Sequence, residues 1–221
     1  SRFNNKYNLS NFDLNSKKPC IFFGIYNNNE WNTYFKYKGP KFILFGGTDI
    51  NPFHFLGKYN IKIIITYKIK NILVLSEKAK NNLYRLNIPS LFFDMNLVNK
   101  KLFLPNKNKI KSNKIYCYNG TYGKPRPDTY GGNLLIQLEK RLPQFKFIYS
   151  SNIKYKYEDM PKLYNSVFIV LRLTSQDGNA NTVQECQSMN VPVVHNISKY
   201  GLKFNNIEDI INHILIAYQN Q

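Results

Sequence analysis

Two carboxylates, Asp177 and Glu185, stand eight positions apart in the segment LRLTSQDGNANTVQECQSMNVPVV, residues 171–194. The segment reads as the end of a buried strand, a polar loop, a helix and a second buried strand. If the helix begins near residues 179–181, Asp177 and Gly178 precede an N-terminus whose N–H groups and dipole favour anions. We therefore predict that a polyanion binds at this helix end while Glu185 holds the hydroxyls of an attached ribose.

Basic residues near this segment could complete an anion site. Arg172 closes an apolar strand, where an unpaired arginine is costly to bury, so it either pairs with Asp177 or meets phosphate; we favour phosphate. Lys124 and Arg126 lie in the Gly/Pro-containing loop 119–127 after another expected strand. They are either phosphate ligands or solvated turn charges, and the sequence leaves both readings open.

The string from Asp177 onward resembles the signature of group-1-type glycosyltransferases with the GT-B fold. Asp177 falls on the first acid of that signature, where glutamate is usual, Gly178 on its glycine and Glu185 on its second acid. Asn190 stands where glycine is usual, and residues 192–194 form the closing Pro-Val-Val. Asn is also common at the left-handed position that ends a helix, so this difference is compatible with the signature.

The resemblance implies an α/β chain with two Rossmann-like parallel-sheet domains that face a cleft. It also implies metal-independent, retaining transfer of a sugar from a UDP- or GDP-type donor, without a cofactor. Catalysis is assigned to Asp177, Arg172 and Lys124. Donor binding is assigned to Gly120, Thr121, Arg126, Thr174, Gly178, Asn179, Ala180, Asn181, Thr182 and Glu185.

The acceptor side of the cleft is expected in the first domain, at Gly24, Gly46, Gly47, Thr48 and Asp49. These glycines could equally be tight turns at strand ends. For Asp49 we favour a helix cap over a catalytic role. Among the histidines, His54 could lie near the cleft, whereas we expect His195 and His213 to be structural.

The chain has 221 residues, which suggests two domains at roughly 100–150 residues each. We place the linker at 94–113 and the domains at 1–104 (acceptor side, shortened) and 105–221 (donor side). In the first domain we expect strands and short helices in alternation, typical of a parallel sheet. The strands are 20–26, 41–45, 61–66, 72–75 and 89–93; the helices are 30–38 and one from Ser76.

The second domain repeats this alternation. We expect strands at 114–118, 146–150, 167–171 and 191–195. We expect helices at 130–142, near 158–164, after the 171–178 loop, and a final helix capped by Asn205 or Asn206 with Ile207, Ile210, Ile211 and Ile214 as its apolar stripe.

The formal net charge of +18 favours nucleic acid or an anionic membrane surface as a partner. The abundance of Lys, Asn, Ile and Tyr also fits a codon bias that spreads charge over a solvated surface. Two alternatives therefore stay open: a basic nucleic-acid-binding protein, and a degenerate transferase that binds nucleotide without turnover. For the transferase, the partners are a nucleotide-sugar donor and an unknown glycan, lipid-linked or protein acceptor, with nucleic acid disfavoured.

No apolar run approaches the ~18 residues of a membrane-spanning helix, and the polar start has no signal-peptide pattern. We expect a cytoplasmic protein, with peripheral contact to an anionic membrane left open. The cysteines Cys20, Cys117 and Cys186 are widely spaced and read as reduced core thiols. We expect no metal site.

Overall fold

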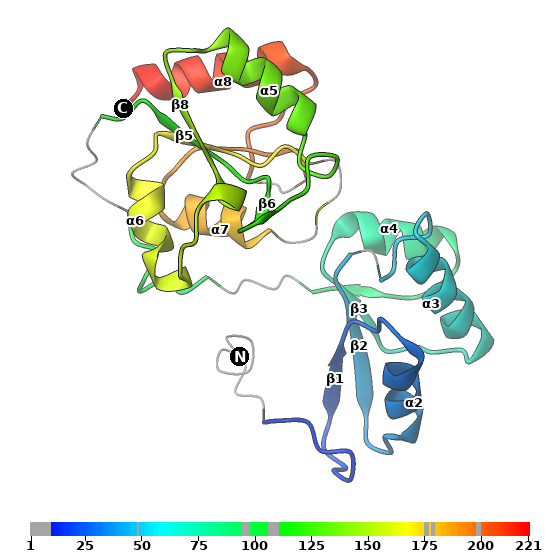
Figure 1. Ribbon diagram of the computed structural model, residues 1–221. Coiled ribbons are helices and arrows are strands. Elements are labelled where there is room, and N and C mark those ends of the chain that lie inside the picture. The colour runs from blue at the N-terminus through cyan, green and yellow to red at the C-terminus, as the bar shows by residue number, and fades with distance from the viewer. Residues whose placement is uncertain are drawn as a thin grey trace. The chain divides into compact units, whose positions relative to one another are not determined.

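The computed structural model describes residues 10–47, 49–93, 98–105, 111–174, 177, 180–197 and 200–221. The chain divides into two compact units, residues 1–97 and 98–221. Each unit contains a parallel sheet with helices packed on it (Figure 1).

The first unit is built on a four-stranded parallel sheet in the order β1-β2-β3-β4. Its strands are β1 (Cys20–Phe23), β2 (Lys41–Phe45), β3 (Ile72–Val74) and β4 (Leu91–Phe92). Its helices are α2 (Asn28–Lys36), α3 (Phe55–Thr66) and α4 (Glu77–Arg85). The side chain of Ser76 caps α4 by accepting a hydrogen bond from the N–H of Ala79, so the helix predicted from Ser76 is confirmed.

The strand predicted at 61–66 is wrong, because these residues form the second half of α3. The run IKIIIT is rich in β-branched residues, which favour strands when considered locally. The buried positions of α3 are Gly57, Asn60, Ile61 and Ile64, a spacing of three and four residues that only a helix places on one side. Tertiary packing of that side overrides local propensity.

The second unit contains a parallel sheet in the order β10-β9-β5-β8 and a small antiparallel hairpin, β6-β7. The strands are β5 (Lys114–Cys117), β6 (Gly120–Thr121), β7 (Lys124–Pro125), β8 (Lys146–Tyr149), β9 (Ile169–Leu171) and β10 (Val193–Val194). The helices are α5 (Gly132–Arg141), α6 (Met160–Asn165), α7 (Asn181–Ser188) and α8 (Ile207–Gln219), with 3-10 turns at Ser150–Asn152 and Tyr157–Asp159.

Both faces of this second sheet are covered. On one face, α5 and α8 pack against Ile115, Ile169 and Leu171. On the other, α6 and α7 pack against Tyr116 and Val170. Burial on two faces explains why the parallel strands read as continuous apolar runs in the sequence.

The end of α7 confirms the interpretation of Asn190. This residue has φ 54°, in the left-handed region that glycine usually occupies after a helix. The last helix is capped as predicted, since the Asn206 side chain accepts from the N–H of Asp209.

The observed division falls at residue 97, seven positions before the expected boundary at 104. Val98 and Phe103 are buried in the second unit, in the cluster that also contains Tyr116 and Tyr164. Val98 and Phe103, within the segment interpreted as a linker, therefore belong to the core of the second unit. Residues 94–97 and 106–110, also within that segment, lie outside the described residues.

Candidate functional site

The candidate site lies in the second unit, at the carboxyl ends of β5 and β9. β5 is central; the chain goes from it to β8 on one side and then to β9 and β10 on the other. The order of the strands reverses between β5 and β9, and open α/β sheets bind ligands at such a switch point. The described donor-site residues of the prediction lie in the segments that follow these two strands, including the start of α7 (Asn181–Ser188).

The loop after β5 is shaped by the hairpin β6-β7. Gly120 has φ 136°, and a Cβ there would lie 2.4 Å from the backbone oxygen of Lys124. The side chain of Asn119 accepts the N–H of Ser151 at 3.0 Å, and the Ser150 hydroxyl donates to the Gly120 carbonyl at 2.7 Å. The loops after β5 and β8 are therefore held together.

This hairpin presents the two predicted cations to solvent. Lys124 and Arg126 are exposed, as is Thr121. The guanidinium carbon of Arg126 lies 5.8 Å from the centre of the Tyr130 ring. Neither cation has a carboxylate partner among the ion pairs of the described residues, so both are available to an incoming anion.

The loop after β9 carries a buried ion pair. Arg172 donates from Nε to Oδ2 of Asp177 at 2.6 Å, and the two side chains are only 9% and 14% exposed. Burial by itself lowers the pKa of Arg172, but the hydrogen bond and charge of Asp177 outweigh burial and raise that pKa above its ordinary value. The structure thus shows the pairing of Arg172 with Asp177, which the sequence analysis placed second to a phosphate contact.

Two aromatic rings, those of Tyr118 and Tyr130, also contact Arg172; neither tyrosine was predicted from the sequence. The guanidinium carbon of Arg172 lies 4.1 Å from the ring centre of Tyr118 and 5.2 Å from that of Tyr130. The rings themselves pack edge to face. These cation–π contacts add to the ion pair with Asp177 in holding the guanidinium in place.

The helix after this loop begins where the sequence predicted. Asn181 is its first residue and Ala180 is its N-cap; Ala180 makes no side-chain cap hydrogen bond, and the first turn contains no acidic residue. Thr182 is buried and accepts from Nη1 of Arg172 at 3.4 Å, while Thr174 is buried just after β9. The N–H groups and dipole of this helix end favour an anion, and Arg172, paired with Asp177, reaches its first turn through Thr182. Gly178 and Asn179 lie outside the described residues.

Glu185 is buried on α7, 5% exposed, and so is not a surface carboxylate. The hydroxyl of Tyr164, from α6, donates to its Oε2 at 2.9 Å. Tyr164 is fully buried, and burial together with Cys186 and Glu185 raises its pKa well above the ordinary value, so it stays protonated as a donor. Glu185 is therefore held in a fixed orientation.

His195, predicted to be structural, follows β10 and is fully buried. Its Nδ1 lies 3.0 Å from the carbonyl oxygen of Arg172, so the hydrogen resides on Nδ1 and Nε2 is an acceptor. Burial lowers the pKa of His195, and Nε2 has no hydrogen-bond partner among the described residues. His195 thus supports the strand end that carries Arg172. His213, half-buried on α8, contacts the carbonyl oxygen of Lys203 at 2.8 Å.

The first-unit residues predicted for the acceptor side lie at strand ends. Gly24 follows β1 with φ 72°, and Gly46 and Gly47 follow β2. Asp49 is fully buried and accepts hydrogen bonds from the N–H groups of Gly46 and Gly47, with the shortest at 2.7 Å. Thr48 lies outside the described residues.

Asp49 closes this turn rather than capping the next helix, because the cap of α3 is His54, whose Nδ1 accepts from Leu56. Desolvation raises the pKa of Asp49, while its backbone hydrogen bonds oppose that rise. The predicted role of Asp49 as a helix cap is therefore wrong. Its carboxylate instead stabilises the turn that follows β2.

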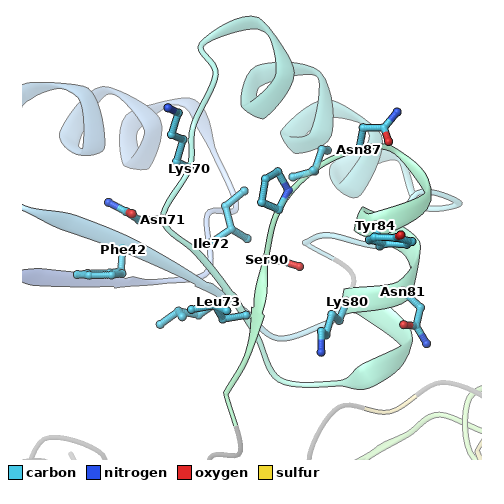
Figure 2. A pocket seen from close by; sticks show the side chains of 13 residues that line it. Phe42, Lys70, Asn71, Ile72, Leu73, Lys80, Asn81, Tyr84, Asn87 and Ser90 are labelled. Atoms are coloured by element: carbon cyan, nitrogen blue, oxygen red, sulfur yellow. The ribbon is translucent and has the colours of Figure 1, made fainter.

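A cavity of about 650 Å³ in the first unit contains none of the predicted residues. It is lined by Phe42, Leu73 and Leu91 of β2, β3 and β4 and by Lys80 and Tyr84 of α4 (Figure 2). Phe42, Ile72 and Leu91 stand at the amino-terminal ends of their strands, the opposite edge from the turn at Gly46. The cavity is distinct from the candidate site.

Within the described ranges, no group of three or more His, Cys, Asp and Glu side chains could hold a metal ion. Cys20 is partly buried, and Cys117 and Cys186 are buried; all three are free thiols. In the same ranges, no helix is both long and apolar enough to cross a bilayer.

No family model and no curated protein matches the chain. Among solved structures, the chain is similar to the glycosyltransferase TarM, with a TM-score of 0.62 and 17% identity over 91% of this chain. A variant of S. aureus TarM in complex with fondaparinux, alpha-GlcNAc-glycerol and UDP matches with a TM-score of 0.63 and 18% identity over 87% of this chain. The chain spans about half the length of these structures, 48% and 47% respectively. The two parallel α/β units thus have the GT-B type of fold, as predicted.

Proposed function

We propose that this protein is a glycosyltransferase that moves a sugar from a UDP- or GDP-type donor to an acceptor bound by the first unit. The observation that carries the proposal is the geometry of the second unit's switch point. There the hairpin cations, the N-terminus of α7 and the fixed carboxylate of Glu185 come from segments that follow β5 and β9. Similarity to TarM, which was solved with UDP, supports the same reading.

The proposed donor site divides the nucleotide between these groups. The diphosphate lies at the N-terminus of α7 and meets Lys124 and Arg126, while Glu185 accepts hydrogen bonds from the ribose. Arg172 is already balanced by Asp177, so neutralising the leaving diphosphate depends mainly on the hairpin cations and the helix end. In this scheme transfer is retaining and needs neither a metal ion nor a protein nucleophile.

Isothermal titration in a chelating buffer tests the donor site directly. We expect UDP or GDP to bind without added divalent ion, and Lys124→Gln with Arg126→Gln to weaken that binding. Lys140→Gln with Lys146→Gln, an exposed pair at the C-terminal end of α5 and the amino end of β8, is the matched control. Absence of binding by every nucleoside diphosphate at millimolar concentration would refute the proposal.

Sugar recognition by Asp177 needs a design that accounts for its ion pair. Asp177→Asn alone leaves a buried arginine without its charge partner, which costs roughly 3–5 kcal/mol. The double variant Asp177→Asn/Arg172→Gln removes both charges and should recover part of that stability. If Asp177 contacts the sugar, the extra thermal stabilisation by a sugar nucleotide over its bare diphosphate disappears in both variants. If the increment persists in the double variant, Asp177 is structural only.

A binding protein without turnover is the second candidate, favoured by the ion pair between Arg172 and Asp177, which engages two of the three residues assigned to catalysis. Donor hydrolysis and transfer assays separate it from an enzyme. Nucleotide binding that depends on Glu185, with no sugar release from any donor that binds, would identify a degenerate transferase.

A further inference from the structure

The outer side of α3 is apolar and cationic. Phe55, Lys58, Tyr59, Lys62 and Ile65 follow one another at helical spacing and therefore share one side of the helix, opposite its buried positions. We define the α3 outer surface as these five residues together with Phe53, Tyr67 and Leu86.

The apolar members of this surface are unusually accessible. Phe53 is 84% exposed, Phe55 78% and Ile65 55%. Leu86, after α4, lines one groove of about 390 Å³ together with Lys58, Lys62 and Ile65. Ile65 and Leu86 thus share one groove with two lysines, and exposed apolar groups gathered on one surface mark an interaction site.

The charge on this surface has a single sign. Residues 50–71 include Lys58, Lys62, Lys68 and Lys70 and contain no Asp or Glu. The carboxylates among the described residues of the first unit lie elsewhere: Glu77 pairs with Lys80, Glu30 binds the N–H of Tyr26, Asp49 is buried in its turn, and Asp13 is in the lead-in before β1. The cations of α3 are therefore not neutralised within the helix.

We propose that the α3 outer surface docks on an anionic lipid bilayer. The phenylalanines and Ile65 would enter the boundary between headgroups and acyl chains, and the lysines would lie at the lipid phosphates. The tyrosines suit the same depth because each has an apolar ring and a polar tip. Tyr59 donates its hydroxyl to Asn28 at 2.5 Å, and the residue remains 42% exposed.

The composition of the surface favours lipid over a nucleic acid or a protein groove. A nucleic acid would use the lysines and could stack on the rings, but it gains nothing from Ile65 and Leu86. A protein partner would require acidic groups and an apolar ridge of matching shape. An anionic bilayer accepts the aliphatic, aromatic and cationic groups together.

Docking in this way has a consequence for the acceptor side. Asp49, which closes the turn at Gly46 and Gly47, precedes the segment that leads into α3, and Asn60 of α3 donates to the carbonyl oxygen of Asp49 at 2.7 Å. The turn is therefore fixed to the docked helix. If the proposed glycosyltransferase activity holds, the acceptor would be presented at the membrane surface; docking itself does not depend on that activity.

The experiment measures sedimentation of the full chain with two kinds of vesicle. One kind is pure phosphatidylcholine, and in the other about a third of the lipid is phosphatidylglycerol. We expect binding to the anionic vesicles only, weakening as salt screens the lysines. Lys58→Glu/Lys62→Glu and Phe53→Ser/Phe55→Ser should each weaken this binding by about tenfold or more. Both pairs are exposed, so thermal unfolding should be unchanged.

Matched changes in the second unit serve as controls, because a net charge of +18 could by itself attract anionic lipid. Lys154→Glu/Lys156→Glu reverses the same number of exposed charges, and Tyr155→Ser removes an exposed ring. We expect both to bind as the wild type does.

No binding to anionic vesicles, or equal loss in the control lysine pair, overturns the proposal. Loss of binding to a random RNA oligonucleotide, with vesicle binding retained in the α3 variants, also overturns it. Nucleotide binding is measured separately and can fail without affecting this result.

Discussion

At the scale of single residues, the buried Glu185 is the sharpest test of the donor site. Glu185→Gln keeps the size of the side chain and an oxygen that can accept from Tyr164, but it removes the charge. Hydrogen bonds to a charged group contribute about 1.5–3 kcal/mol, so we expect nucleotide affinity to fall by roughly ten- to a hundredfold. Titration calorimetry measures the effect, and unliganded melting should change little.

Glu139→Gln provides a matched control for that experiment. Glu139 also accepts a hydrogen bond from a tyrosine hydroxyl, that of Tyr149 at 3.0 Å, but it is exposed. Its replacement should leave nucleotide affinity unchanged. Equal affinities for wild type and both variants would show that Glu185 has only a packing role.

His195 gives the protein a pH-dependent contribution to stability. Burial lowers its pKa below the ordinary 6.5, so the folded chain keeps the ring neutral while the unfolded chain takes up a proton. Stability is therefore fully present above about pH 6.5 and is lost as pH falls through 6.5 toward the lowered folded pKa. His195→Asn keeps a donor for the Arg172 carbonyl and does not titrate, so its melting temperature should fall less between pH 7.5 and 5.5. Parallel pH dependence of the two proteins would contradict this account.

At the scale of elements, the β6-β7 hairpin depends on its first glycine. Gly120→Ala forces a Cβ against the Lys124 carbonyl at a φ that side chains rarely adopt, so the hairpin must deform. Gly123 also has a positive φ, 68°, but a Cβ added there by Gly123→Ala would meet no atom within 4 Å. We expect Gly120→Ala to weaken nucleotide binding well beyond Gly123→Ala, measured by titration of UDP or GDP on each variant. Similar losses in the two would mean that the hairpin backbone does not shape the site.

The elements also show where local sequence signals were sufficient. The caps Ser76 and Asn206 start α4 and α8 as predicted, because a cap is a contact between near neighbours in the chain. The predicted strand at 61–66 is a helix, because what distinguishes the two is which side of the segment the core covers. That information lies in distant residues such as Trp31, whose Nε1 donates to Asn60 of α3 at 2.9 Å.

At the scale of the whole molecule, the net charge of +18 makes nucleic-acid binding a measurable alternative. Binding that neutralises 6–10 phosphates should weaken roughly a thousandfold or more between 50 and 200 mM salt. For a glycosyltransferase we expect weak, salt-sensitive binding of a random oligonucleotide that competes poorly with nucleotide. Tight oligonucleotide binding that is unchanged by Glu185→Gln would favour the nucleic-acid reading instead.

The sequence by itself determined the local parts of this protein: the alternation of strands and helices, the parallel sheets and the start of α7 near residue 181. These follow from apolar patterning and turn chemistry within short windows. The tertiary structure decided which charged groups meet. Asp177 pairs with Arg172 from the end of β9, and Glu185 is held by Tyr164 from α6. Whether a carboxylate lies in solvent or is buried beside a partner depends on how separate elements pack. A short stretch of sequence does not determine that packing.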